Sequence, residues 1–159
     1  MDWHFSADVE LNSPLIGALV GGTRLLNTWA VGIRVGAERE RVGMYAFLER
    51  SHLEEPSYND DVSNDLISFG GAGWVSYFEN RMRSMILLGT TILMTESFQN
   101  PQGTMGLYSE LRPAGFVFHI GKANIQLYPI TLCWLVPVLQ NVPLFYLHYR
   151  TAVSLGGTF

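Results

Sequence analysis

Residues 145–159 alternate between apolar and polar side chains. The odd positions are mostly apolar with aromatic residues toward both ends, and the even positions hold small or polar residues. A period of two places these sets on opposite faces of a β-strand. One apolar and one polar face, with aromatics at the boundaries, are typical of a strand in a membrane-spanning barrel. A strand of a soluble barrel or sandwich is the alternative.

The same alternation recurs in other segments, most clearly in residues 3–11, and together with the turn residues between less regular segments it predicts eight strands. They cover residues 3–11, 29–36, 42–49, 66–78, 82–95, 104–120, 125–137 and 145–159. Long connections at 12–24 and 51–65 alternate with tight turns, as they do in bacterial outer-membrane barrels. We therefore predict an all-β fold: an eight-stranded antiparallel up-and-down transmembrane β-barrel, with residues 1–159 as its single domain.

One run is long enough for a transmembrane helix instead. Residues 125–147 carry no lysine, arginine, aspartate or glutamate. The run contains Pro129, Pro137 and Pro143, however, and each proline in a helix interior removes a backbone hydrogen bond. Strands are therefore the better interpretation of this run.

Composition agrees with a membrane barrel. Charged residues are 15% of the chain and mean hydropathy is +0.15, both unusual for a soluble protein. The net charge of −4 gives no sign of a nucleic-acid partner. The single Cys133 excludes a disulfide framework, and no cluster of histidine and carboxylate residues has the spacing of metal ligands. We expect neither a metal nor another cofactor.

Several predicted strands are apolar on both faces, and this bears on the lumen. Residues 84–94, 116–118 and 132–136 are apolar or hydroxylic at almost every position. A small barrel ordinarily fills its interior with polar side chains, because no lipid reaches it. This pattern predicts a partly apolar interior that can hold a hydrocarbon chain. A tightly packed apolar plug is the alternative.

Two prolines fall within consecutive predicted strands. Pro113 and Pro129 flank one turn, and proline cannot donate a hydrogen bond to a sheet ladder. Both should weaken the same seam between strands, which in a membrane leaves carbonyl groups without partners at a cost. A side opening for a lipid tail would explain the pair, and ordinary β-bulges are the alternative.

Four stretches carry a resemblance to a known family. They are residues 111–130 with their two prolines, Gly71-Ala-Gly-Trp74, residues 43–52, and Trp3-His4. The chain resembles the outer-membrane lipid A palmitoyltransferases (PagP-like) over about half of its length. The resemblance implies a monomer in the outer membrane of a Gram-negative bacterium. Its implied activity moves a palmitoyl chain from a phospholipid donor to lipid A of lipopolysaccharide, within the lipid bilayer.

The resemblance also assigns roles to residues. Gly73 would floor the acyl pocket, Pro113 and Pro129 would flank a lateral gate, and His4 would match a catalytic histidine of the first strand. The family's Asp-Ser pair falls on Ser51-His52, so suitable residue types are present in a different order.

Acyl transfer needs a base for the attacking hydroxyl and donors for the oxyanion. His52 is a candidate base at the start of a predicted loop, with Ser51 beside it and Glu49 near. His4 and His148 are further candidates, because both fall on predicted lumen faces and the first and last strands of a closed barrel are neighbours.

Three other functions stay open at this point. A non-enzymatic outer-membrane barrel for adhesion or structure would show a polar, filled lumen. A hydrolase of the lipid A deacylase type would use similar residues on an acyl ester. A soluble barrel that carries a hydrophobic ligand would need its apolar outer rows to be covered.

Overall fold

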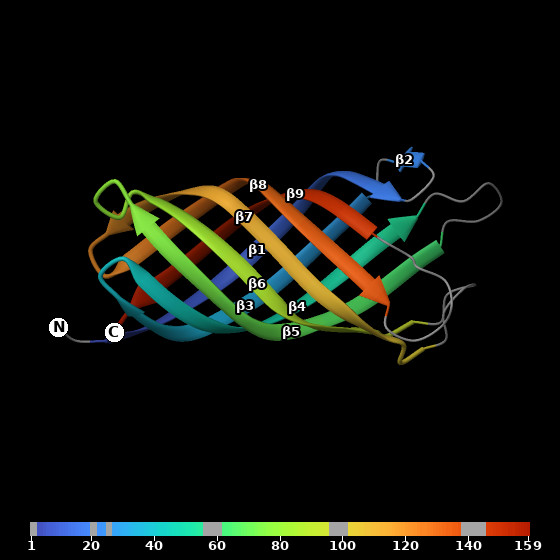
Figure 1. The fold of residues 1–159 in the computed structure, drawn as a ribbon, viewed down its shortest axis with the longest axis horizontal. Coiled ribbons are helices and arrows are strands. Elements are labelled where there is room, and N and C mark those ends of the chain that lie inside the picture. The colour runs from blue at the N-terminus through green and yellow to red at the C-terminus, as the bar shows by residue number, and fades with distance from the viewer. Residues whose placement is uncertain (1–2, 20–21, 25–26, 56–61, 96–101, 138–145) are drawn as a thin grey trace.

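The computed structural model describes the backbone of residues 3–19, 22–24, 27–55, 62–95, 102–137 and 146–159. Side chains are described in these ranges except at 14–28, 53–64 and 137–149. Strands dominate the described chain (Figure 1), and it contains no helix long and apolar enough to cross a membrane.

The strands pair antiparallel in chain order. Their bounds are β1 (His4–Leu19), β2 (Gly22–Arg24), β3 (Asn27–Arg39), β4 (Val42–Glu55), β5 (Val62–Tyr77), β6 (Met82–Leu93), β7 (Met105–Ile120), β8 (Ala123–Pro137) and β9 (Tyr146–Thr158). The short β2 pairs only with the end of β1, so the barrel wall consists of β1 and β3 to β9. Consecutive wall strands are antiparallel neighbours, which is the up-and-down topology predicted from the sequence.

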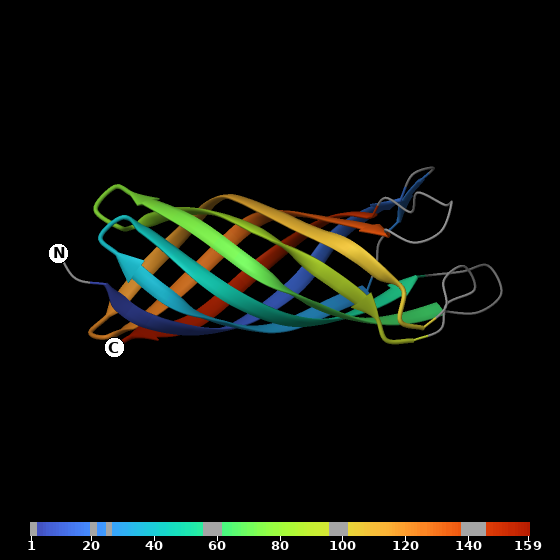
Figure 2. The same cartoon turned by 60° about the horizontal axis from the view of Figure 1, so that its bottom comes forward.

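The sheet closes on itself through β1 and β9, where Val9 lies opposite Leu155. Figures 1 and 2 show the resulting cylinder of tilted strands, with both chain ends and the tight turns at one end. Closure leaves no edge strand in the wall, so every wall strand has two neighbours for its backbone hydrogen bonds. The eight-stranded barrel is confirmed.

The two faces of the wall follow the predicted alternation. On β1, the polar Ser6, Asp8 and Glu10 are buried inside, whereas Val9 and Leu11 are exposed outside. The outer face of the wall carries an apolar belt, which includes Phe5, Ile33, Val35, Met44, Leu48, Phe69, Ile86, Leu88, Leu107, Phe118, Val153 and Leu155. Apolar surface of this extent around a closed barrel is suited to lipid.

The strands at the long-connection end are longer than predicted. The expected loop 12–24 contains the rest of β1, which continues to Leu19 and pairs there with β9. The expected loop 51–65 contains the end of β4, which continues to Glu55, and the start of β5 at Val62. Hydrogen bonding between neighbouring strands extends them beyond the regularly alternating sequence, because the ladder uses backbone groups of any residue.

The two prolines lie at irregular points of the sheet, on both sides of the β7–β8 pair. The β7–β8 register shifts on both sides of Ala114, next to Pro113, and the β8–β9 register shifts around Pro129. The Pro113 carbonyl accepts hydrogen bonds from Ser84 Oγ at 2.5 Å and from Tyr77 Oη at 3.2 Å. The Pro129 carbonyl accepts one from Thr151 Oγ1 at 3.2 Å. Side-chain hydroxyls therefore give these two proline carbonyls hydrogen-bond partners at the bulges.

Candidate functional site

The lumen contains a network of buried charges. The buried charged residues in the described chain are Asp8, Glu10, Arg34, Glu49, Arg83, Glu110, Arg112 and Arg150, so arginines and carboxylates are equal in number. They alternate with outward apolar residues on β1, β3, β4, β6, β7 and β9, which is why all of them point inward. Buried charges are tolerated when they are paired and hydrogen-bonded, as they are here.

Arg112 joins two carboxylates on one side of the network. Its Nη1 and Nη2 each donate to one oxygen of Glu10 at 2.5 Å, and its Nε donates to Glu110 at 2.5 Å. Arg34 Nη2 adds a second cation to Glu10 at 3.1 Å. Because β1 and β7 are not neighbours in the wall, the fork of Arg112 on Glu10 crosses the lumen.

Arg150 makes a second fork across the lumen. Its Nη1 and Nη2 each donate to Glu49 at 2.9 Å, and Nη2 also contacts Glu110 and Tyr108. Asn12 Nδ2 donates to both Glu10 and Glu49, at 3.0 and 2.9 Å, and links the two forks. The network therefore connects β1, β4, β7 and β9 through the interior.

This network limits the open space in the predicted, partly apolar lumen. Leu66, Trp74, Met85, Leu87 and Leu135 do face inward, as expected from the apolar strands. They surround polar groups, however, and do not line a continuous apolar channel, because the Arg112 and Arg150 forks cross it. The described lumen is therefore mixed: a paired polar network, the sign expected of a non-enzymatic barrel, crosses an interior that also holds a buried apolar cluster.

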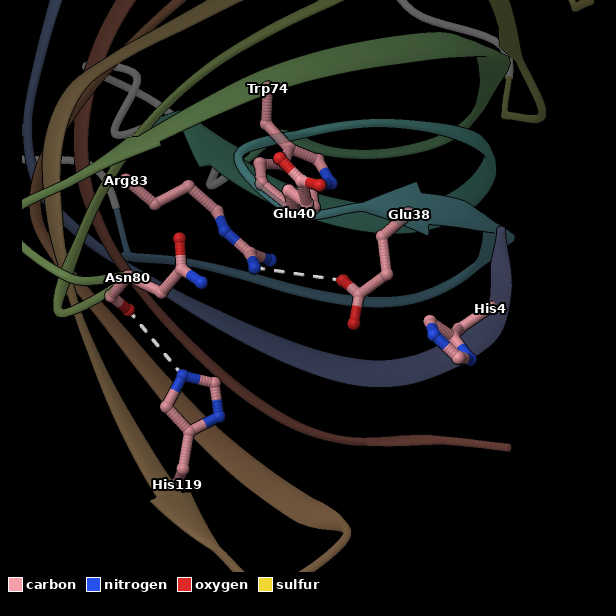
Figure 3. Close-up of a pocket in the computed structure, with 7 residues that line it drawn as sticks. All are labelled: His4, Glu38, Glu40, Trp74, Asn80, Arg83 and His119. Carbon is pink, nitrogen blue, oxygen red and sulfur yellow. Dashed lines mark hydrogen bonds and ion pairs between the residues drawn. The ribbon is translucent and has the colours of Figure 1, made fainter. Parts of the chain in front are cut away.

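A cavity of about 350 Å³ lies at the short-turn end of the barrel (Figure 3). Its lining is His4, Glu38, Glu40, Trp74, Asn80, Arg83 and His119. The Arg83 guanidinium stacks 3.6 Å from the Trp74 ring centroid, and its Nη2 lies 3.7 Å from Glu38. Glu38 also accepts a hydrogen bond from Thr158 at 2.8 Å. These pairings hold Arg83 and Glu38 to the barrel wall at the mouth.

The turn between β5 and β6 shapes the same cavity. Phe78, Glu79 and Asn80 all adopt positive φ angles, of 51, 56 and 64°, which is uncommon for residues other than glycine. The turn brings the Asn80 carbonyl to 3.4 Å from His119 Nε2, as Figure 3 shows. His119 therefore lines the cavity together with His4.

The structure separates Ser51 from His52. Both lie inside β4 and not in a loop, and consecutive residues of a strand point to opposite faces. Ser51 is buried in the lumen and donates to Glu49 at 2.9 Å. His52 lies on the outer face, where its Nδ1 is 2.8 Å from Asp65 Oδ1. Ser51 and His52 do not form a shared catalytic pair.

The remaining predicted catalytic residues are also dispersed. Glu49 is engaged by Arg150 and Asn12 in the lumen network. His4 lies opposite Glu38 at the short-turn end, whereas His52 lies toward the other end of the wall. The backbone of His148 lies opposite Gly17, also toward the long-connection end and away from His4. The side chain of His148 is outside the described residues.

Gly73 lies on the outer face of β5, between the inward-facing Ala72 and Trp74. A Cβ atom added at Gly73 would meet no atom within 4 Å. This position does not fit the predicted role as the floor of an interior acyl pocket, because a side chain there would extend away from the lumen.

Sequence reasoning missed two sets of residues. The first set is Tyr108, Glu110 and Arg112, which occupy alternate positions of one predicted strand. This spacing predicts three polar side chains on the same face. Asp65 was assigned to an acidic loop, although it belongs to β5 and lies opposite His52. No local pattern predicts that pairing, because it depends on the register of two strands.

The fold is shared with known outer-membrane proteins. No family model matches the chain, and no curated protein matches it. The structure is similar to Neisserial surface protein A (TM-score 0.63, 10% identity, covering 99% of this chain and 97% of that chain). It is also similar to Ail, the attachment invasion locus protein of Yersinia pestis, in complex with the heparin analogue sucrose octasulfate (0.60, 12%, 100% of both chains).

A third similar structure is the outer membrane enzyme PagL (TM-score 0.58, 10% identity, covering 92% of this chain and 97% of that chain). At these identities the likeness shows the fold and carries no activity to this chain. Together with the apolar belt, the fold confirms a barrel of the Gram-negative outer membrane, embedded in its lipid bilayer. The finer resemblance to palmitoyltransferases is not shown and stays a prediction.

Proposed function

We propose that this chain is a non-enzymatic outer-membrane barrel that acts through the surface at its long-connection end. The observation that supports this proposal is the lumen network, in which the Arg112 and Arg150 forks cross the interior. An acyltransferase needs room for a hydrocarbon chain, and a transport channel needs a continuous path. Side chains that pair across the lumen occupy the space that either activity requires.

The dispersal of the predicted catalytic residues also supports this proposal. General base catalysis requires the base within hydrogen-bond reach of the hydroxyl that it deprotonates. Ser51 faces the lumen while His52 faces outward, and His4 lies near the other end of the wall. Palmitoyl transfer from a phospholipid to lipid A, as implied by the resemblance, is therefore the less favoured function.

The end of β4, the connection after it and the start of β5 suggest the kind of partner. Residues 53–65 contain several acidic residues and no lysine, arginine or histidine. Short turns face the periplasm and longer connections face the exterior in bacterial barrels. We propose that the partner at the cell surface carries positive charge, unlike the polyanion in the Ail complex.

One observation favours a second candidate, hydrolysis of a lipid acyl ester. The imidazole of His52 is oriented by Asp65 on the lipid-facing side of the wall, and an oriented imidazole can act as a general base. Ser51 is on the other face, so this dyad would have to activate water on the ester. This function corresponds to the deacylase-type hydrolase considered from the sequence.

Mass spectrometry of lipid A from cells with and without the protein tests these functions. The non-enzymatic barrel predicts identical lipid A, a hydrolase predicts a lost acyl group, and an acyltransferase predicts an added one. Either change in mass would overturn the proposal. Purified barrel in planar bilayers should also show no stepwise conductance, whereas stable open-channel currents would contradict a closed lumen.

A further inference from the structure

Four residues form a polar group on the outer face of the barrel, which we call the rim cluster: Trp29, Arg50, His52 and Asp65. Strand register brings them together, because Trp29 lies opposite His52 and His52 lies opposite Asp65. Arg50 lies one outward position closer to the short-turn end on β4. The rim cluster therefore spans β3, β4 and β5 in two adjacent rows of outward-facing residues.

The rim cluster is organised around one carboxylate. Asp65 Oδ1 lies 2.8 Å from His52 Nδ1, and Asp65 Oδ2 lies 3.2 Å from Arg50 Nη2. The ring of Trp29 stacks on His52 with centroids 5.6 Å apart and planes 21° apart. The imidazole of His52 and the guanidinium of Arg50 thus share one carboxylate. The side chain of Arg50 remains 61% exposed.

Apolar residues surround the rim cluster on the side toward the membrane. Arg50 lies between Val31 on β3 and Ile67 on β5 in its row. The next outward row toward the short-turn end consists of Ile33, Leu48 and Phe69, all of them exposed. The rim cluster is therefore the point where charged side chains follow directly on the apolar belt.

An arginine at this point has a defined environment in a bilayer. A charged residue on the lipid face of a barrel is costly at the midplane and is tolerated near the interface. Tryptophan is enriched at the same level, among the lipid headgroups. Arg50 and Trp29 therefore lie where the phosphate groups of outer-leaflet lipids lie, since the long-connection end faces the exterior.

We propose that the rim cluster binds the phosphate of a phosphorylated lipid of the outer leaflet. The guanidinium of Arg50 carries five donors in a planar fork that matches phosphate oxygens. Asp65 contacts one terminal nitrogen of this fork, and the side chain of Arg50 is largely exposed, so its other donors are accessible to the headgroup layer. The acyl chains of the same lipid lie along the row of Ile33, Leu48 and Phe69. This site lies outside the lumen, so it does not depend on the proposal that the barrel is non-enzymatic.

The test measures lipid binding to the folded barrel in a maltoside detergent by native mass spectrometry. The probe is lipid A with two phosphates, and its enzymatically dephosphorylated form is the matched comparison. We expect the wild type to retain the phosphorylated form preferentially. Arg50→Gln should weaken this binding about tenfold or more, the usual effect of losing a charge-assisted hydrogen bond. Inorganic phosphate should compete only weakly, because it lacks the acyl chains.

Asp65→Asn separates a binding role from a structural one. Arg50→Gln and Asp65→Asn both remove the ion pair, but only Arg50→Gln removes the phosphate ligand. Asp65→Asn should therefore bind the phosphorylated lipid at least as tightly as the wild type. Arg41→Gln, in the turn at the opposite end, is the matched control and should bind normally.

Three results would overturn the proposal. Wild-type binding by Arg50→Gln would remove the assigned ligand. An equal loss of lipid binding in Arg50→Gln and Asp65→Asn would mean that the ion pair has a structural role and that Arg50 does not bind the phosphate. Equal binding of the two lipid forms would exclude recognition of phosphate. Heat-modifiable gel migration checks that each variant is folded, and Arg50→Lys, which keeps the charge, should fall between wild type and Arg50→Gln.

Discussion

Replacing Arg112 by methionine removes the cation that joins two carboxylates in the lumen. The Arg112 side chain is fully buried and donates three hydrogen bonds of 2.5 Å, two to Glu10 and one to Glu110. Methionine has a similar length and fills much of the space, so the change isolates the loss of charge and donors. Glu10 keeps Arg34, and Glu110 keeps Arg150.

The expected cost follows from what remains behind. Breaking a buried ion pair by removing one partner typically costs about 3–5 kcal/mol, because the other charge stays buried without full compensation. Since both carboxylates retain one arginine, we expect Arg112→Met to lower the free energy of unfolding by about 3 kcal/mol, the lower end of this range. An exposed ion pair such as Arg50 with Asp65 contributes about 0–1 kcal/mol.

Urea unfolding of the barrel in lipid vesicles, followed by tryptophan fluorescence, measures this difference. Arg112→Met should shift the midpoint strongly, whereas Arg50→Gln serves as the matched control and should shift it little. The double variant Arg112→Met with Glu10→Gln should recover part of the loss, because it makes the buried arginines and carboxylates equal in number again. A loss below about 1 kcal/mol in Arg112→Met would refute the paired network, since that is the value of an exposed pair.

Two further changes test the wall. Gly156→Ala should destabilise the barrel by about 1–3 kcal/mol, because the new Cβ would lie 1.6 Å from Asp8 Oδ1; an unchanged urea midpoint would contradict this packing. Removing both hydroxyls that cap the Pro113 carbonyl, with Tyr77→Phe and Ser84→Ala, should cost about 1–3 kcal/mol by leaving a carbonyl without a partner. Faster hydrogen exchange confined to this seam is the expected sign, and exchange as slow as wild type would argue against the caps.

The fold was predictable because alternation is a local property of the sequence. β1, β3 and β9 show their inner and outer residues in the sequence with a period of two, and the outer set is apolar because it forms the belt. Ser6, Asp8 and Glu10 on β1 illustrate this, since their burial follows directly from their spacing. Strand ends were less predictable, because residues such as Leu19 pair through backbone groups that any sequence supplies.

The lumen was harder to predict, because its pairs are long-range. Glu10 and Arg112 are separated by 102 positions, and Glu49 and Arg150 by 101. The sequence around each of these four residues predicts only one polar side chain on the inner face of a strand. Only the closed barrel shows that their charges balance and meet across the interior, whereas the apolar runs in the sequence favoured a pocket for a hydrocarbon chain.

The alternation of side chains along a strand also limits which residue roles a family resemblance can assign. Ser51 and His52 are adjacent in sequence, and within β4 adjacency forces them to opposite faces of the wall. A loop would impose no such restriction, so the catalytic assignment depended on the assumption that β4 ended before Ser51. Because β4 instead continues to Glu55, His52 lies beside Asp65 and Trp29 on the outer face, and Ser51 lies beside Glu49 in the lumen. The same one-residue step that separates the predicted catalytic pair therefore creates the rim cluster.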